Sequence, residues 1–378
     1  MFLNFRRLRR YQCMQLMTTC LVLSVVMVCW EQLDNGVVNH FKSTSYRYLV
    51  NSFSYINRSL TVPREEARRF SDFPYLLDHP DKCAGQDVFL LLFVKSRPEN
   101  VGRRAAIRAT WGNESYIQSA LGVTVKVAFA LGATEAPRRG RSGPQERLAA
   151  EDRLHGDLIQ KDFLDSFHNL TLKLIMQLHW VHHRCRHARF FMTADDDIFV
   201  HTPNLVGYLQ EARRRGAADL WIGRVYKGAP PIRSRDSKYF VPWEMYQWYA
   251  YPDYTAGAGY VVSGEVADKA YHASLTLNAS LYIDDVFMGL CANAVGLSPQ
   301  DHAFFSGDGR TPYHRCVYER MMTSHGHVED LQELWAAATH PQVRRAASGP
   351  LGRLYCAAVR VALLCRPSAT YPCKAAFS

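Results

Sequence analysis

The chain has 378 residues, of which 48% are hydrophobic and 12% are aromatic. An apolar content this high supports a large folded core and excludes a chain that is disordered throughout. The 45 basic and 35 acidic residues leave a net charge of +10. Four arginines lie within the first ten residues, so the remainder carries an ordinary charge for its size, and the sequence gives no reason to expect a nucleic-acid partner.

An uncharged segment from Tyr11 to Trp30 follows these arginines. At about 1.5 Å per residue, a helix of this length would span about 30 Å, which is the thickness of a bilayer's hydrocarbon core. A cleaved signal peptide is the alternative, but its apolar core is shorter, and Glu31 follows here instead of a small-residue cleavage site. We therefore expect a cytoplasmic tail at 1–10, an uncleaved signal anchor at 11–30 and a lumenal remainder.

The remainder divides into an irregular polar segment at 31–85, which we interpret as a stem, and a globular domain at 86–378. Four N-glycosylation sequons support a lumenal location. Their acceptor residues are Asn57, Asn113, Asn169 and Asn278.

The globular part begins with a continuous apolar run, Val88–Val94, which is typical of a strand buried on both faces. Strands alternating with helices predict an α/β fold with a mainly parallel central sheet flanked by helices. The other expected strands are Val123–Leu131, Arg189–Thr193 and Leu220–Val225, and the expected helices are Asn100–Trp111, Glu151–His183, Asn204–Arg215 and Val286–Ala294.

Seven cysteines follow the anchor, and none belongs to a paired CxxC arrangement, so a structural zinc site is not expected. In an oxidising lumen, scattered cysteines favour disulfides, and an odd number leaves one cysteine unpaired. We expect the bonds Cys83–Cys185 and Cys291–Cys316. Of the remaining three cysteines, two are expected to bond and one to stay free: Cys356, Cys365 and Cys373.

Three consecutive aspartates, Asp195, Asp196 and Asp197, follow the strand at 189–193. Ligands of open α/β sheets bind outside the carboxyl ends of the strands, and carboxylates there can chelate a hard divalent cation. A DxD pattern also arises by chance about once in a chain this long, so a solvated acidic turn is the alternative. The position at the end of a buried strand favours the ligand site.

A second acidic pair, Asp284-Asp285, lies among apolar residues. Adjacent carboxylates repel each other and resist desolvation unless one has a structural or chemical task. We expect one to cap the helix that follows and the other to act as a general base.

A glycine-rich segment, Tyr251–Tyr260, precedes the apolar residues Val261 and Val262. Its glycines permit close approach of the backbone to a ligand, and its tyrosines could stack on a sugar. The spacing matches neither a Rossmann fingerprint nor a P-loop. A tight turn before a core strand is the alternative.

These features occur in an order that resembles the β-1,3-glycosyltransferases, the family that includes β-1,3-galactosyl- and β-1,3-N-acetylglucosaminyltransferases. The resemblance covers roughly residues 87–335. A type II topology with a stem is followed in chain order by the motifs Arg103–Gly112, Asp195–Asp197, Tyr251–Tyr260 and Ile283–Gly289.

The resemblance implies a GT-A type nucleotide-sugar-binding fold, a UDP-sugar donor, a Mn²⁺ ion and a Golgi membrane location. By position, Asp197 would be the principal metal ligand with Asp195 assisting, and His325 or its neighbour His327 would face the metal. Asp285 matches the catalytic aspartate, although Asp284 stands where the family usually has glutamate. Four residues would lie at the donor side, three of them equally suited to structural support: Asp196, Arg104, Arg108 and Trp111.

Segments at 290–293, 299–302, 304–307, 311–314 and 321–327 further resemble family members that act on lactosylceramide. The implied reaction is an inverting transfer of N-acetylglucosamine from UDP-N-acetylglucosamine to the 3-hydroxyl of terminal galactose on lactosylceramide, the first step toward lacto- and neolacto-series glycolipids. The residues expected at the acceptor are Tyr254, Gly257, Gly259, Asp301 and His302.

Three other functions stay open at this point. The chain could be a β-1,3-galactosyltransferase, an N-acetylglucosaminyltransferase that extends polylactosamine, or a lumenal sugar-binding protein without catalysis. For the aromatic and polar C-terminal residues, the alternative to acceptor binding is that they only pack the core.

Overall fold

The computed structural model describes residues 14–24, 72–134, 143–307 and 309–364. Residues 14–24 form a helix with exposed side chains. Across the described ranges, no helix combines the length and the apolar character needed to span a membrane. The ends of the expected anchor at 11–13 and 25–30 lie outside these ranges, as do the greater part of the stem, Asn57, Cys365 and Cys373.

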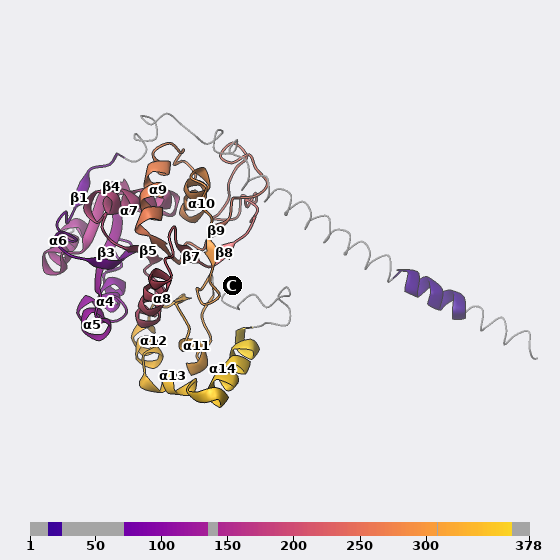
Figure 1. Cartoon of the computed structure of the whole chain (residues 1–378). Coiled ribbons are helices and arrows are strands. Elements are labelled where there is room, and N and C mark those ends of the chain that lie inside the picture. Colours follow the sequence, from indigo (N-terminus) through magenta and orange to yellow (C-terminus); the bar gives the residue numbers. More distant parts are fainter. Residues whose placement is uncertain (1–13, 25–71, 135–142, 308, 365–378) are drawn as a thin grey trace, which may run out of the picture.

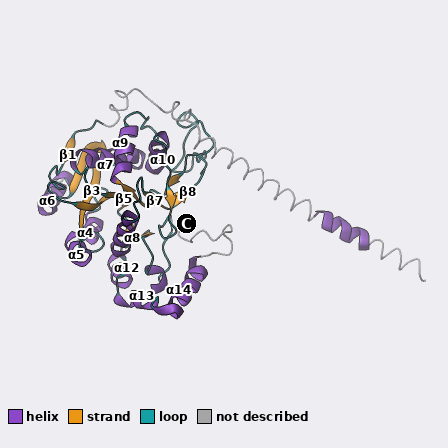
Figure 2. Ribbon diagram, in the orientation of Figure 1, coloured by secondary structure: helices purple, strands orange, loops and turns teal. Residues whose placement is uncertain are grey.

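Within the described residues, an eight-stranded sheet forms the centre of the globular domain, and helices cover both of its faces (Figures 1 and 2). Its strand order is β1-β4-β3-β2-β5-β10-β7-β11. The strands are β1 (Tyr75–Leu77), β2 (Val88–Lys95), β3 (Thr124–Ala133), β4 (Leu158–Leu164), β5 (Phe190–Asp195), β7 (Trp221–Gly223), β10 (Gly259–Ser263) and β11 (Gln300–Asp301). Two small sheets pair β6 (Ile198–Val200) with β12 (Thr323–His325) and β8 (Val225–Tyr226) with β9 (Tyr254–Thr255).

The helices follow the strands along the chain and alternate with them over most of its length. They are α4 (Val101–Ala109), α5 (Glu114–Leu121), α6 (Pro144–His155), the 3₁₀ turn η1 (Phe167–Asn169), α7 (Leu170–Arg184), α8 (Thr202–Arg214), α9 (Gly264–Ser274), α10 (Asp284–Ala294), α11 (Arg315–Tyr318), α12 (Leu331–Ala338), α13 (Pro341–Ala346) and α14 (Gly349–Leu364).

The four neighbouring strands β4, β3, β2 and β5 run parallel, as the alternation of elements predicts. Strand β10 lies antiparallel between β5 and β7, and β1 is antiparallel at the opposite edge, so the sheet is mixed. Because parallel strands end at the same edge, the residues that follow β2, β4 and β5 meet in one place.

The alternating side chains of β2 divide the core into two layers. Leu91 and Phe93 pack with α7, α9 and α10, whereas Leu90 and Leu92 pack on the other face with α4, α5, α8 and α12. All eight residues of β2 are buried, which confirms the strand expected from the apolar run.

The single helix expected at 151–183 is wrong. Helix α6 ends at His155, Gly156 adopts a left-handed φ of 60°, and β4 follows before α7 begins at Leu170. The helical spacing of the leucines is real, but it belongs to α7 alone. Pairing of β4 with β3 outweighs the weak local helical pattern over 158–164.

The folded domain includes residues that we expected in the stem. Strand β1 at 75–77 pairs with β4, and Cys83 forms the expected disulfide with Cys185 at the end of α7. This bond ties the entry of the domain to the helix layer.

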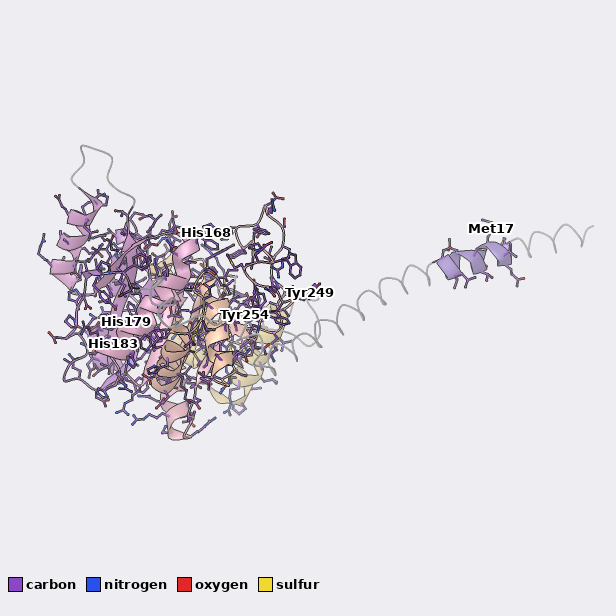
Figure 3. The ribbon with its side chains drawn as sticks, turned by 90° about the horizontal axis from the view of Figure 1, so that it is seen from above. Met17, His168, His179, His183, Tyr249 and Tyr254 are labelled. Carbon is purple, nitrogen blue, oxygen red and sulfur yellow. A yellow bond between two sulfur atoms is a disulfide. The ribbon has the colours of Figure 1, made fainter. Side chains whose placement is uncertain are left out.

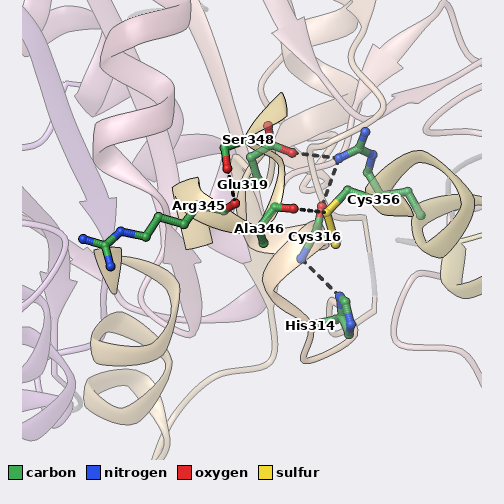
Figure 4. The surroundings of a disulfide bond; sticks show 8 residues. His314, Cys316, Glu319, Arg345, Ala346, Ser348 and Cys356 are labelled. Carbon is green, nitrogen blue, oxygen red and sulfur yellow. Dashed lines mark hydrogen bonds and ion pairs between the residues drawn. A yellow bond between two sulfur atoms is a disulfide. The ribbon is translucent and has the colours of Figure 1, made fainter. Parts of the chain in front are cut away.

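The second expected disulfide is wrong, because Cys316 bonds to Cys356 and Cys291 is a free, buried thiol. Cys291 lies on the inner face of α10 within the sheet core, whereas Cys316 on α11 faces α14 (Figure 4). Arg360 of α14 strengthens this contact by binding the carboxylate of Glu319 at 2.8 Å. Cys291 and Cys316 therefore lie in different parts of the domain.

Candidate active site

A cleft of about 480 Å³ opens at the edge where the parallel strands end. Lys95 closes β2, Asp195 closes β5, and Asp165 follows β4. The beginning of α10 and the end of β12 complete the cleft, with Asp285 and His325 among the lining residues. This is the place that the topology of an α/β sheet predicts for a ligand.

The three aspartates at the end of β5 have different partners. Asp196 accepts hydrogen bonds from Ser96, Asn100 and Arg103 at 2.6–2.8 Å, so it holds the loop after β2 and lines the cleft as a satisfied carboxylate. Asp195 faces Lys95. Desolvation in the cleft raises the pKa of Asp195, Lys95 opposes this effect, and Asp284 and Asp197 add to it.

The buried ammonium group of Lys95 compensates the negative charges of Asp195 and Asp284 in this cleft. Its side chain is 4% exposed, and its ammonium lies 2.7 Å from Asp284, 3.0 Å from Asp195 and 3.0 Å from the carbonyl oxygen of Gly257. Burial opposes the charge, but the two carboxylates outweigh it and raise the pKa of Lys95. A lysine buried in this way requires such partners.

Asp195, Asp197 and His325 bring one ligand atom each to within 4.8 Å of one another. Oδ1 of Asp197 is buried without a hydrogen-bond donor, and it lies 3.4 Å from Nε2 of His325. Although burial opposes ionisation, His325 and Arg103 hold the pKa of Asp197 below its usual value. Two carboxylates and one imidazole fit a divalent cation such as Mn²⁺.

The neighbouring His327 has a different task. It is buried, with Nε2 at 2.7 Å from the Ser324 hydroxyl and Nδ1 at 2.9 Å from the Asp330 carboxylate. Gly326 between the two histidines has a φ of 82°, and this turn directs His325 and His327 to different surroundings. Of the two, His325 lines the cleft.

Asp284 and Asp285 open α10, but neither is its N-cap, because Ile283 occupies that position. Asp284 instead pairs with Lys95, which corrects the expected capping role. The Asp285 carboxylate accepts hydrogen bonds from the amide of Gly257 at 3.2 Å and from that of Val286 at 2.7 Å. Desolvation, with the Asp284 charge adding, raises the pKa of Asp285 to about 7.

The glycine-rich segment contributes to the cleft through its backbone. A Cβ at Gly257 would lie 3.3 Å from Cβ of Asp285, so glycine lets the loop approach the acidic pair closely. Gly259 lies behind the cleft in β10, where a Cβ would meet Ile198 at 3.0 Å. The Tyr254 ring packs against Tyr226, and of the three expected acceptor residues in this segment only Gly257 is among those that line the cleft.

Arg104, Arg108 and Trp111 lie outside the cleft lining. The fully buried Arg104 binds Glu151 with two hydrogen bonds and donates to the carbonyl oxygens of Arg97 and Pro98. Arg108 bridges Glu151 and Asp157, and Trp111 is buried in the core. Of the two roles left open for these residues, their contacts favour structural support, and Arg104 alone binds the loop after β2.

Asp301 and His302 lie at the far edge of the sheet and do not line the cleft. Asp301 accepts a hydrogen bond from the amide of Val225, and His302 packs against Tyr208 and Phe305. The ring contacts of His302 match the alternative in which the C-terminal residues pack the core, whereas Asp301 is exposed.

Several lining residues were not identified from the sequence. Lys95 terminates an apolar strand, a position where a charge is itself a signal. Asp165, which binds the buried Lys173 at 2.8 Å, was hidden by the incorrect helix assignment. The other lining residues lie on η1 and on the connection between β8 and β9, where no sequence motif marks them: Phe167, Lys238 and Tyr239.

Three of the expected glycosylation residues lie in the described ranges and use their amides locally. Asn113 caps α5 through a hydrogen bond from the amide of Tyr116, and Asn278 accepts one from Ser280. The Asn169 amide donates to the carbonyl oxygen of Leu164 at 2.8 Å. Their modification stays a prediction.

Comparison with known proteins identifies the family of this chain. The galactosyltransferase family matches residues 102–303. The chain is 60% identical to lactosylceramide 1,3-N-acetyl-beta-D-glucosaminyltransferase A of Danio rerio, with 100% of both chains covered. It is 56% identical to lactosylceramide 1,3-N-acetyl-beta-D-glucosaminyltransferase of Homo sapiens, with 100% of this chain and 99% of that one covered.

Among solved structures, the chain is similar to the WbbM bifunctional glycosyltransferase with a TM-score of 0.35 and 9% identity, covering 69% of this chain and 51% of that one. A score at this level does not establish a shared fold. The sequence relatives do establish descent, and the chain belongs to the galactosyltransferase family.

Proposed function

We propose that this protein transfers N-acetylglucosamine from UDP-N-acetylglucosamine to the 3-hydroxyl of terminal galactose on lactosylceramide. The observation that carries this proposal is the full-length similarity to proteins named for that reaction, at 56–60% identity. The cleft contains the groups that such a transfer needs, namely a half-buried carboxylate for the acceptor proton and a separate acidic cluster for a cation.

The proposed fold is of the GT-A type, with a nucleotide sugar bound beyond the ends of β2 and β5. Asp195, Asp197 and His325 would hold Mn²⁺, which supplies positive charge that neutralises a diphosphate when it is bound. The loop at 96–100 and Arg103 form the adjoining wall, so the donor diphosphate would lie between this wall and the aspartates.

Asp285 is the proposed base. A carboxyl with a pKa of about 7 is near the value at which a base is both largely ionised and able to hold a proton at neutral pH. It removes the proton of the galactose 3-hydroxyl while that oxygen attacks the anomeric carbon. The bond from that carbon to the diphosphate oxygen breaks, and UDP leaves with the electron pair. One displacement inverts the configuration, so an α-linked donor gives a β-linked product.

The acceptor side of the cleft has an aromatic surface. Phe167 packs edge-to-face against Tyr239 with ring centroids 5.3 Å apart, and both residues line the cleft. The apolar face of a galactose ring suits such a surface. We therefore assign acceptor contact to Phe167 and Tyr239 in place of Asp301 and His302.

The proposed setting is a Golgi membrane, with residues 11–30 as the anchor of a single-pass type II protein and the transferase domain in the lumen. The uncharged segment and the sequons support this topology. Anchoring would keep the enzyme at the surface that carries its lipid acceptor, which raises the effective concentration. A mature N-terminus near residue 31 in cells would contradict it.

A donor-by-acceptor matrix tests the reaction. The full chain in detergent with Mn²⁺ is assayed with UDP-N-acetylglucosamine and UDP-galactose against lactosylceramide, soluble lactose and N-acetyllactosamine chains. We expect the highest rate with UDP-N-acetylglucosamine and lactosylceramide. Preference for UDP-galactose would indicate a β-1,3-galactosyltransferase, and preference for soluble chains would indicate polylactosamine extension.

A further inference from the structure

A second cluster of histidine and aspartate lies away from the cleft, where α7 and α9 pack side by side over one face of the sheet. His182 belongs to the last turn of α7. Asp268 and His272 are four residues apart on α9, so they lie on the same side of that helix. Each of the three residues offers one ligand atom, and these atoms lie within 4.8 Å of one another.

Aspartate is the central member of the cluster. Nδ1 of His182 lies 2.6 Å from Oδ1 of Asp268, and Nε2 of His272 lies 3.8 Å from Oδ2 of the same carboxylate. The Tyr271 ring stacks on the His182 imidazole, with centroids 4.4 Å apart and planes at 29°. This stack orients the His182 imidazole, whereas the His272 side chain is largely exposed.

Two imidazole nitrogens and one carboxylate oxygen form a donor set typical of Zn²⁺, with water as the fourth ligand. Tetrahedral Zn²⁺ with ligands at about 2.0–2.2 Å places the ligand atoms roughly 3.3–3.6 Å apart. His182 approaches Oδ1 of Asp268 at 2.6 Å and His272 approaches Oδ2 at 3.8 Å, so the contact with His182 must lengthen and the side chains must rotate to place one ion among all three residues. We propose that His182, Asp268 and His272 form a Zn²⁺ site that joins α7 to α9.

The neighbouring charge does not block this site. Nε of Arg186 lies 3.7 Å from Asp268, but its side chain is 63% exposed and can turn into solvent when a cation binds. His272 is also exposed, so an ion can enter from the surface. The bound ion would brace the layer that the Cys83–Cys185 bond already ties at the end of α7, and α9 in turn packs on α10, which carries Asp285.

Zn²⁺ binding by the full chain in detergent, purified without a polyhistidine tag, tests the site. Zn²⁺ is titrated in competition with a chromogenic chelator, in an Asp197→Asn background that removes a ligand from the cleft cluster. We expect one Zn²⁺ per chain and a melting temperature that rises with Zn²⁺ concentration. Loss of an outer partner of a metal ligand costs about 10–100-fold in affinity, so His272→Ala should weaken binding by at least about 100-fold.

His183→Ala is the matched control, because His183 (labelled in Figure 3) is the next residue on α7. It contacts the Tyr271 hydroxyl at 3.2 Å. The control variant should keep the Zn²⁺ equivalent and the thermal shift. Because His272 is largely exposed, His272→Ala should fold normally without Zn²⁺, and its melting temperature in chelator should match that of the background variant. Equal Zn²⁺ affinity in the His272→Ala and His183→Ala variants, or no bound Zn²⁺ in the background variant, would overturn the proposal.

Discussion

The cleft and the α7–α9 surface each bring three histidine and aspartate residues together, yet they differ in what surrounds them. In the cleft, Asp195 and Asp197 come from the end of β5, His325 comes from β12, and all three lie beside a buried lysine and a second acidic pair. On α7 and α9, helical spacing and a surface contact suffice to gather the residues. The cleft gathers buried charges from several strands, as a catalytic site requires. The α7–α9 cluster lacks such charges and is suited only to joining two helices.

The donor atoms differ in the same sense. Two carboxylates and one imidazole favour a hard cation, whereas two imidazoles and one carboxylate favour Zn²⁺. The cleft also contains Asp285, a carboxyl with a pKa of about 7, and the α7–α9 cluster has no comparable group. The rate of sugar transfer should therefore depend on residues of the cleft and not on the α7–α9 cluster.

The largest effect is expected for Asp285→Asn. The substitution keeps the shape of the side chain but removes the base, and loss of a general base costs about 10²–10⁴-fold in rate. UDP binding should stay nearly unchanged, because Asp285 is not among the cation ligands that we assign. Steady-state kinetics and calorimetry with UDP and Mn²⁺ measure the two quantities. Equal losses of rate and of UDP affinity would show that Asp285 binds the donor.

Lys95→Met should have the largest effect on stability. It leaves the carboxylates of Asp195 and Asp284 close together without their cation, and breaking a buried ion pair costs about 3–5 kcal/mol. Lys269→Met is the control, because the Lys269–Asp219 pair is exposed and should contribute less than about 1 kcal/mol. Urea denaturation of the full chain measures both. Similar losses would mean that the cleft charges are solvated.

His325→Ala and His327→Ala distinguish a histidine that binds the cleft cation from one that only stabilises the fold. Loss of an outer partner of a metal ligand costs about 10–100-fold in affinity, so loss of the proposed ligand in His325→Ala should weaken Mn²⁺ binding by at least about 100-fold. His327→Ala should leave Mn²⁺ affinity unchanged but lower the free energy of unfolding by about 1–3 kcal/mol, because Ser324 and Asp330 lose a buried partner. His272→Ala should change neither Mn²⁺ affinity nor transfer rate. Calorimetry with Mn²⁺ ranks the three variants, and a loss of Mn²⁺ affinity in His327→Ala would reverse the histidine assignment.

The sequence predicts those parts of the molecule that depend on local pattern. The buried strand β2, the position of the aspartates after β5 and the acidic pair at α10 follow from apolar runs and strand ends. The failures depend on distant partners. Strand β4 is stabilised by pairing with β3, and Asp284 binds Lys95, which lies 189 residues away in the sequence. Cys316 bonds to Cys356 because α14 packs on α11.

The metal clusters, too, depend on residues that are distant in the sequence, and so they are difficult to predict from it. Only the spacing of Asp268 and His272 is visible in the sequence, and the absence of CxxC pairs argued against structural zinc. His182 is brought to this pair by the packing of two helices that are separated by β5 and by the strands that follow it. Similarly, Asp301 and His302 were expected at the acceptor because they follow the catalytic pair in sequence, but β11 carries them to the far edge of the sheet.

The smallest effect, and the one most specific to the cleft, is a shift of the pH profile. Desolvation and the Asp284 charge both keep Asp285 protonated up to a pKa of about 7. Only the ionised form accepts the acceptor's proton, so kcat/KM should fall about tenfold per pH unit below that value. Asp284→Asn removes the like charge and leaves Lys95 to favour ionised Asp285, so the midpoint should move to lower pH.

The same pKa fixes the sign of a stability effect. Between about pH 4 and pH 7 the folded state holds the Asp285 proton that the unfolded state has released, so this group's contribution to stability should decrease as pH rises through that range. Asp284→Asn should flatten that dependence, whereas His272→Ala should alter neither the stability curve nor the rate profile. Rate profiles and urea denaturation at matched pH values measure both. A profile that moves to higher pH in Asp284→Asn would show that the pairing of Lys95 with Asp284, and not repulsion, controls the base.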